Sequence, residues 1–141
     1  MEGCMIDASG LNYWAVIVVW VIYMAVGSYW YSPKGFGKLW SKLSGVDIMK
    51  LPQQEANRAI MYVIVSSLVQ AITLAIVLNS IGVTNGPEGM AASLVLWLGL
   101  TAATTIGTNF YARKSWKFWW LNASFFLVTM SINGLILGAW Q

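Results

Sequence analysis

Charged side chains are absent from four long stretches of the sequence, and this absence limits the possible folds more than any other feature. The stretches are residues 11–31, 59–83, 90–111 and 118–140, and none contains Asp, Glu, Lys or Arg. An α-helix needs about 20 apolar residues to cross a hydrocarbon layer about 30 Å thick. Strands of a membrane barrel would be about 10 residues long and would alternate apolar with polar side chains. We therefore predict an all-α integral membrane protein with four transmembrane helices, in a single domain over residues 1–141.

The composition excludes most kinds of catalytic site. Only 9% of the residues are charged, against about 25% in a soluble domain, and the chain has no His and one Cys, Cys4. An intramembrane hydrolase needs a nucleophile with a base, or metal ligands. A proton-coupled carrier needs a group that titrates inside a span. We therefore expect a protein that is not an enzyme, with no catalytic residues, no cofactor and no metal site.

The basic residues indicate how the chain sits in the membrane. All eight lie in the loops 32–58 and 112–117, while the other connections and the tails hold none. The positive-inside rule then predicts that both loops are cytoplasmic and both termini are outside. This pattern suits a bacterial or archaeal cytoplasmic membrane and explains the basic pI, so we expect no nucleic-acid partner. Because residues 1–10 carry Glu2 and Asp7 and no basic residue, we expect the first span to act as its own insertion signal.

The first loop contains a predicted interfacial helix at about residues 34–44. Apolar residues recur there at helical spacing, with lysines on the other side: Phe36, Leu39, Trp40 and Leu43 against Lys34, Lys38 and Lys42. Such a pattern is typical of a helix lying in the membrane surface. It predicts an anchor that fixes helix tilt or, alternatively, a docking surface for a partner or a gate. Gly45 would end this helix, and Pro52 could begin a cytoplasmic extension of the second span.

Small and hydroxyl side chains form stripes along the last two spans. On one face of the third span lie the threonines Thr101, Thr104, Thr105 and Thr108. Roughly opposite lie the small residues Gly99, Ala103 and Gly107. The fourth span has a GxxxG pair, Gly134 and Gly138. Small residues let helices approach closely, and hydroxyls can bond to their own backbone or to a neighbouring helix. A helix with two such faces has little surface suited to lipid. The third span is therefore predicted to lie at the centre of the bundle.

Amide side chains provide a second set of polar candidates. Gln70 falls near the middle of its span, at the predicted depth of Thr101 and Thr129. Asn109 and Asn122 flank the short turn 112–117 and are predicted to be close enough in depth to pair, while Asn79 and Asn133 lie towards the outer leaflet. Two interpretations remain open: interhelical hydrogen bonds, worth about 0.6 kcal/mol each on average, or a polar path for water, an ion or a small solute.

The sequence also resembles a known family. The residues after the first span, Trp30-Tyr31-Ser32-Pro33 followed by Phe36-Gly37-Lys38 and Trp40, resemble the signature of small four-helix membrane proteins grouped as domain of unknown function 1761. The resemblance continues through Thr108-Asn109-Phe110-Tyr111 and ends in Gly134-Leu135-Ile136-Leu137-Gly138-Ala139-Trp140. It extends from about residue 12 to residue 140. It implies the same four-helix layout and brings no established activity, so no catalytic residue is implied.

These observations favour a function based on association. We expect a non-catalytic polytopic membrane protein that acts as an accessory or scaffolding subunit of a larger membrane complex, or as a homo-oligomer. Its expected partners are membrane lipids and other membrane protein subunits or further copies of itself. The alternative is a channel or facilitator for a small solute or ion, lined by the threonines of the third span.

Overall fold

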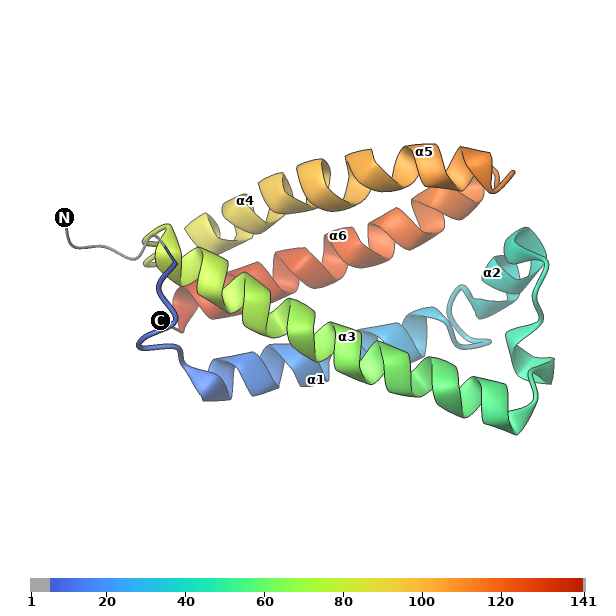
Figure 1. Ribbon diagram of the computed structural model, residues 1–141, viewed down its shortest axis with the longest axis horizontal. Coiled ribbons are helices and arrows are strands. Elements are labelled where there is room, and N and C mark those ends of the chain that lie inside the picture. Colours follow the sequence, from blue (N-terminus) through green and yellow to red (C-terminus); the bar gives the residue numbers. More distant parts are fainter. Residues whose placement is uncertain (1–5, 141) are drawn as a thin grey trace.

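The computed structural model describes residues 6–140, and this part of the chain is helical without any β-strand. Its elements are α1 (Tyr13–Trp30), α2 (Gly37–Ser44), the 3-10 turn η1 (Ile48–Lys50), α3 (Gln53–Ser80), α4 (Gly86–Leu96), the π-helical turn η2 (Trp97–Ala102), α5 (Ala103–Tyr111) and α6 (Trp116–Ala139). Four helical segments are long and apolar enough to cross a membrane: α1, α3, the continuous segment Gly86–Tyr111, and α6. The four predicted spans are confirmed, and successive spans run in opposite directions along the long axis of the bundle (Figure 1).

Local chemistry sets the helix ends. The side chains of Asn12, Asn85 and Ser115 accept hydrogen bonds from the first-turn N–H groups of α1, α4 and α6, which have no partner within the helix. The helix α3 begins directly after Pro52, so it includes the extension that the sequence predicts before residue 59. Gly45 ends α2 at a φ of 81°, a left-handed conformation that favours glycine.

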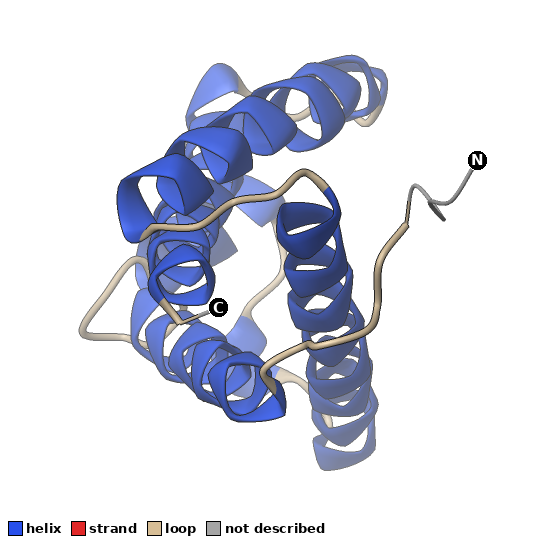
Figure 2. Ribbon diagram, turned by 90° about the vertical axis from the view of Figure 1, so that its left-hand side faces the viewer, coloured by secondary structure: helices blue, strands red, loops and turns tan. Residues whose placement is uncertain are grey.

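The helix α6, not the third span, occupies the centre of the bundle. It lies between α1 on one side and the third span on the other, as both ribbon views show (Figures 1 and 2). In an 18-residue window of each span, 50% of the residues are buried in α6 and 22% in each of the others. The prediction of a central third span is therefore wrong. The physical reason is that α6 packs against both α1 and the third span, while the third span packs mainly against α6.

The contact between α4 and α6 is built on glycine. A Cβ added at Gly134 would come within 3.0 Å of both Ser93 Oγ and the Gly89 carbonyl oxygen, and one added at Gly138 would clash with the Asn85 carbonyl oxygen. Backbone therefore meets backbone at this crossing, as small residues allow in membrane helices. The GxxxG pair of α6 has its counterpart in Gly89 and Ser93 of α4, which sequence analysis did not single out.

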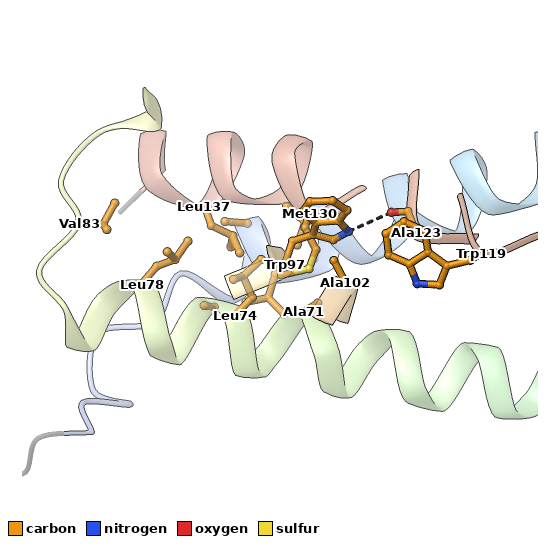
Figure 3. Packing of buried hydrophobic residues seen from close by; sticks show 14 residues of the cluster. Ala71, Leu74, Leu78, Val83, Trp97, Ala102, Trp119, Ala123, Met130 and Leu137 are labelled. Atoms are coloured by element: carbon orange, nitrogen blue, oxygen red, sulfur yellow. Dashed lines mark hydrogen bonds between the residues drawn. The ribbon is translucent and has the colours of Figure 1, made fainter. Parts of the chain in front are cut away.

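A π-helical turn, η2, interrupts the third span where the sequence predicts a regular helix. The N–H of Ala103 bonds to the carbonyl of Leu98, five residues back, which is the π-helical pattern. Residues five apart then lie on one face, so both Trp97 and Ala102 are buried. The indole Nε1 of Trp97 donates to the Ala123 carbonyl of α6 at 2.9 Å, within an apolar cluster shared with α3 and α6 (Figure 3).

The helix α3 is fastened to α1 and to the N-terminal segment. Near the middle of the two helices, the indole Nε1 of Trp20 donates to Ser67 Oγ at 3.1 Å. At the end of α3, Asn79 Nδ2 donates to the carbonyl oxygens of Asp7 and Ser9 at 3.0 and 3.1 Å. The amide of Asn79 thus holds residues 7–9 against the bundle.

Candidate functional site

All eight basic residues lie at one end of the bundle, which we call the basic end. It comprises the connection 31–52, the turn 112–115 and the adjoining first turns of α3 and α6, on the right of Figure 1. Asp7 and Glu88 lie at the opposite end. Polar contacts at this end join the end of α1, α2, the turn 112–115 and α6, so we describe it as the candidate site.

The connection between α1 and α2 is a tight turn that depends on two glycines. The N–H of Phe36 donates to the Trp30 carbonyl at 2.7 Å, and a Cβ at Gly35 or at Gly37 would come within 3.0 Å of a backbone oxygen at the end of α1. The ring of Phe36 then packs on the Trp30 indole, with 4.7 Å between ring centroids. The signature residues after the first span therefore form a tight turn, which directs α2 back towards the bundle.

Asn122 of α6 joins three helices at this end. Its Oδ1 accepts hydrogen bonds from Tyr31 Oη at 3.1 Å and from the indole Nε1 of Trp40 at 3.2 Å, while its Nδ2 donates to the Phe118 carbonyl. Trp40 thus fastens α2 to α6, although the sequence pattern places this residue on a membrane-facing surface. Of the residues predicted for the interfacial helix, Lys38, Lys42, Leu39 and Phe36 are exposed.

Lys114 connects the turn 112–115 to α2. Its Nζ donates to the Ser44 carbonyl oxygen and lies 5.7 Å from the centroid of the Phe118 ring. The carbonyl of Lys114 accepts in turn from Asn109 Nδ2 at 3.2 Å, which shapes the turn between α5 and α6. No sequence pattern distinguishes Lys114 from its basic neighbours Arg113 and Lys117.

A cavity of about 270 Å³ lies between α5 and α6 and ends near Lys114. It is lined by Thr101, Thr105, Thr108, Asn109, Ala112, Lys114, Phe118, Trp119, Asn122, Ala123 and Phe126. Thr105, Thr108 and Ala112 are exposed, so the cavity opens to the outside of the bundle. Five of the eight predicted polar candidates therefore share one cavity.

Within this cavity, the predicted pairing of Asn109 with Asn122 does not occur. Asn109 Nδ2 donates to the carbonyls of Lys114 and Ser115 instead. The Oδ1 of Asn122 is occupied by the donors from α1 and α2. Each amide is therefore bonded to other partners: Asn109 to the backbone of the turn, and Asn122 to Tyr31, Trp40 and the Phe118 carbonyl.

The threonines of the third span bond mainly to their own helix. The Oγ1 atoms of Thr104 and Thr105 donate to the carbonyls of Leu100 and Thr101 at 2.6 Å each, and Thr108 Oγ1 donates to the Thr105 carbonyl at 3.1 Å. Thr105 Oγ1 also accepts from the indole Nε1 of Trp119 at 3.0 Å. The hydroxyl hydrogens are thus used within the protein, which makes the cavity wall less polar than the sequence suggests.

Gln70, Thr104 and Asn133 do not line this cavity. Gln70 is half-buried on α3, and Thr104 faces outward. Asn133 of α6 is buried, and its Oδ1 accepts no hydrogen bond from residues 6–140. The predicted polar residues therefore form no continuous path across the described chain.

The predicted packing stripe Gly99, Ala103 and Gly107 contacts no other helix within residues 6–140. A Cβ at Gly99 or Gly107 would have no other atom within 4 Å, and Ala103 is exposed. The expected use of this stripe inside the bundle is wrong, because the third span turns a different face, with Ala102 of η2 and Asn109 of α5, towards the interior. The same spacing in α6, at Gly134 and Gly138, does form a close contact.

Comparison with known proteins gives one match. The model of a family described as "Protein of unknown function (DUF1761)" matches residues 14–138. No curated protein and no solved structure matches the chain. Among the described residues, no group of three His, Cys, Asp or Glu side chains could hold a metal ion.

Proposed function

Because the chain belongs to the DUF1761 family, whose description names no activity, we propose its function from its geometry. The protein acts, without catalysis, by helix association in the membrane, as an accessory or scaffolding subunit of a larger complex or as a homo-oligomer. The observation that carries this proposal is the open small-residue face of the third span.

This outer face consists of Gly99, Leu100, Ala103 and Gly107. Leu100 is 69% exposed, and both glycines have open space where a side chain would stand. Small residues at this spacing let a second helix approach to backbone contact. The chain already uses such a contact once, between Gly89 and Gly134. The outer face offers a second surface of the same kind to another chain.

The charge distribution supports one orientation. With all eight basic residues at the basic end, the positive-inside rule puts loops 32–58 and 112–117 in the cytoplasm and both termini outside. A bacterial or archaeal cytoplasmic membrane is consistent with this arrangement. Because the outer face lies on a membrane span, a partner helix would meet it within the bilayer.

The proposal is tested by measuring the mass of the protein extracted from its native membrane in a mild detergent. We expect a particle larger than one chain, containing either several copies or other subunits. The double variant Gly99→Leu with Gly107→Leu should shift it to a single chain, because leucine side chains keep a partner helix at a distance. The control Val69→Leu, on an exposed position of α3, should leave the mass unchanged. A wild-type protein that elutes alone as a monomer would contradict the proposal.

A facilitator for a small solute is the second candidate, and the cavity lined by Thr101, Thr105 and Thr108 is the observation in its favour. The close contact between α4 and α6 stands against a path through a single chain. Flux into liposomes decides between the two candidates. A facilitator requires flux above that of empty liposomes, and a reduction of that flux by Thr105→Val with Thr108→Val, two residues that line the cavity.

A further inference from the structure

We propose that the cavity between α5 and α6 binds one anionic phospholipid. The phosphate lies at Lys114, and one acyl chain enters the cavity along Phe118, Ala123 and Phe126. This site is separate from the outer face, because Ala103 and Thr105 project about 160° apart on a helix of 3.6 residues per turn.

The end of the cavity at the turn 112–115 is positively charged. Lys114 forms no ion pair with any residue in 6–140, and its Nζ uses one donor on the Ser44 carbonyl. A lysine ammonium has three donors, so two remain for an anion. Arg113 and Lys117 are exposed close by in the sequence, while Asp47 is paired with Lys50 at 3.5 Å. Basic pockets between membrane helices are suited to anionic headgroups.

The rest of the cavity suits hydrocarbon. Its apolar residues include Phe118, Ala123 and Phe126, and the hydroxyl hydrogens of Thr105 and Thr108 are held by carbonyls of their own helix. A wall whose polar hydrogens are already bonded does not require water. An acyl chain can therefore lie against Thr105 and Thr108 without leaving either hydroxyl hydrogen unpaired.

The depth of the cavity matches one leaflet. Thr101 lies ten residues before the end of α5 at Tyr111, which corresponds to about 15 Å along a helix. This is half of a hydrocarbon layer about 30 Å thick. Because Thr105, Thr108 and Ala112 are exposed, a lipid can enter from the side. A soluble phosphate would use only the Lys114 end, so the cavity favours a lipid over a free anion.

The proposal is tested with delipidated protein in detergent, by native mass spectrometry with added phosphatidylglycerol or phosphatidylcholine. We expect one tightly bound phosphatidylglycerol, preferred over phosphatidylcholine by about fivefold, which is the effect of one lysine near a charged headgroup. Lys114→Gln should remove most of this preference, and Lys114→Arg should keep it. The matched control Lys42→Gln, an exposed lysine of α2, should keep it as well.

Two further arms separate the lipid from other occupants. Thr108→Phe, which fills the cavity, should weaken binding of both lipids, and glycerol phosphate should not displace bound phosphatidylglycerol. The proposal is overturned by equal affinity of the wild type for the two lipids, or by equal effects of Lys114→Gln and Lys42→Gln. It is also overturned if Thr108→Phe binds lipid normally, or if glycerol phosphate competes as well as the lipid does.

Discussion

The helix α6 contacts the third span in two different ways along its length. Towards the opposite end, Gly134 and Gly138 meet Gly89 so closely that no Cβ would fit between the backbones. At the basic end, α5 and α6 separate, and a cavity of about 270 Å³ lies between them. The π-helical turn η2 lies between these regions and carries Trp97, which bonds to α6.

One helix pair thus combines a closely packed part with an open part. Backbone contact at the α4–α6 crossing permits one geometry, because neither helix can move closer or rotate without a clash. The basic end is held by side chains instead, chiefly through Asn122 and Lys114. Side-chain contacts leave space that a lipid, a solute or a rearrangement can use.

The largest expected effect is at the closed crossing. Gly134→Val places methyl groups against Ser93 Oγ and the Gly89 carbonyl, so we expect a loss of about 3 kcal/mol in the free energy of unfolding, the upper range for overpacking. Unfolding in mixed micelles of mild detergent and sodium dodecyl sulfate measures it. Gly107→Val is the matched control, because that position is open in the chain, and it should change the value by less than about 0.5 kcal/mol. Equal losses would abolish the distinction between the two regions.

The next effect concerns the side chains that hold the basic end. Asn122→Leu removes the acceptor of both Tyr31 Oη and Trp40 Nε1, so we expect a loss of about 1–2 kcal/mol in the same measurement. Gln70→Leu serves as the control, since Gln70 makes no hydrogen bond within residues 6–140, and it should be close to neutral. If Asn122→Leu is also neutral, the link between α1, α2 and α6 does not stabilise the fold.

A smaller effect is expected at the π-helical turn. Trp97→Phe removes one hydrogen bond, to the Ala123 carbonyl, and keeps an aromatic ring in place. We expect a loss of about 0.6 kcal/mol, the average for such bonds between membrane helices. Trp120→Phe, at an exposed position of α6, is the control. An unchanged stability of the Trp97 variant would mean that η2 is held by packing alone.

The smallest effect is a pH dependence at the opposite end. The hydroxyl and N–H of Ser9 donate to the Asp7 carboxylate and hold the pKa of that carboxyl below its usual value. A depressed folded-state pKa stabilises the fold above the unfolded pKa of about 3.9, and this contribution is lost as the pH falls through the lower folded-state pKa. Because Asp7 is exposed, we expect only a slight fall in the unfolding midpoint at acidic pH. That component should be smaller in Ser9→Ala, which loses the hydroxyl donor and keeps the backbone N–H, and an identical pH profile for both proteins would contradict it.

The four spans could be predicted from the sequence because their lengths and missing charges depend on the bilayer, which acts alike on every span. The central helix could not be predicted in this way. Gly99 with Gly107 and Gly134 with Gly138 carry the same kind of spacing, and only the position of a neighbouring helix decides which pair is packed. The sequence likewise cannot show that Thr104 and Thr105 bond to their own carbonyls.

Some features of the basic end had a signal in the sequence, and others had none. The glycines at positions 35 and 37 and the tryptophan at position 40 indicate a specific turn and a helix after α1. The bond from Trp40 to Asn122 depends on how that helix folds back, which local spacing does not determine. The π-helical turn at Trp97–Ala102 has no sequence pattern that separates it from a regular helix.

Photo-crosslinking from the third span is the decisive experiment on whether the outer face is a surface for another membrane helix. A photoreactive amino acid replaces Leu100, which neighbours Gly99 on this face, and in a second protein it replaces Val69 of α3; both positions are exposed. After illumination in native membranes, we expect a protein adduct from position 100, to a second copy or to another subunit, and lipid adducts alone from position 69. Lipid adducts alone from position 100 would contradict it.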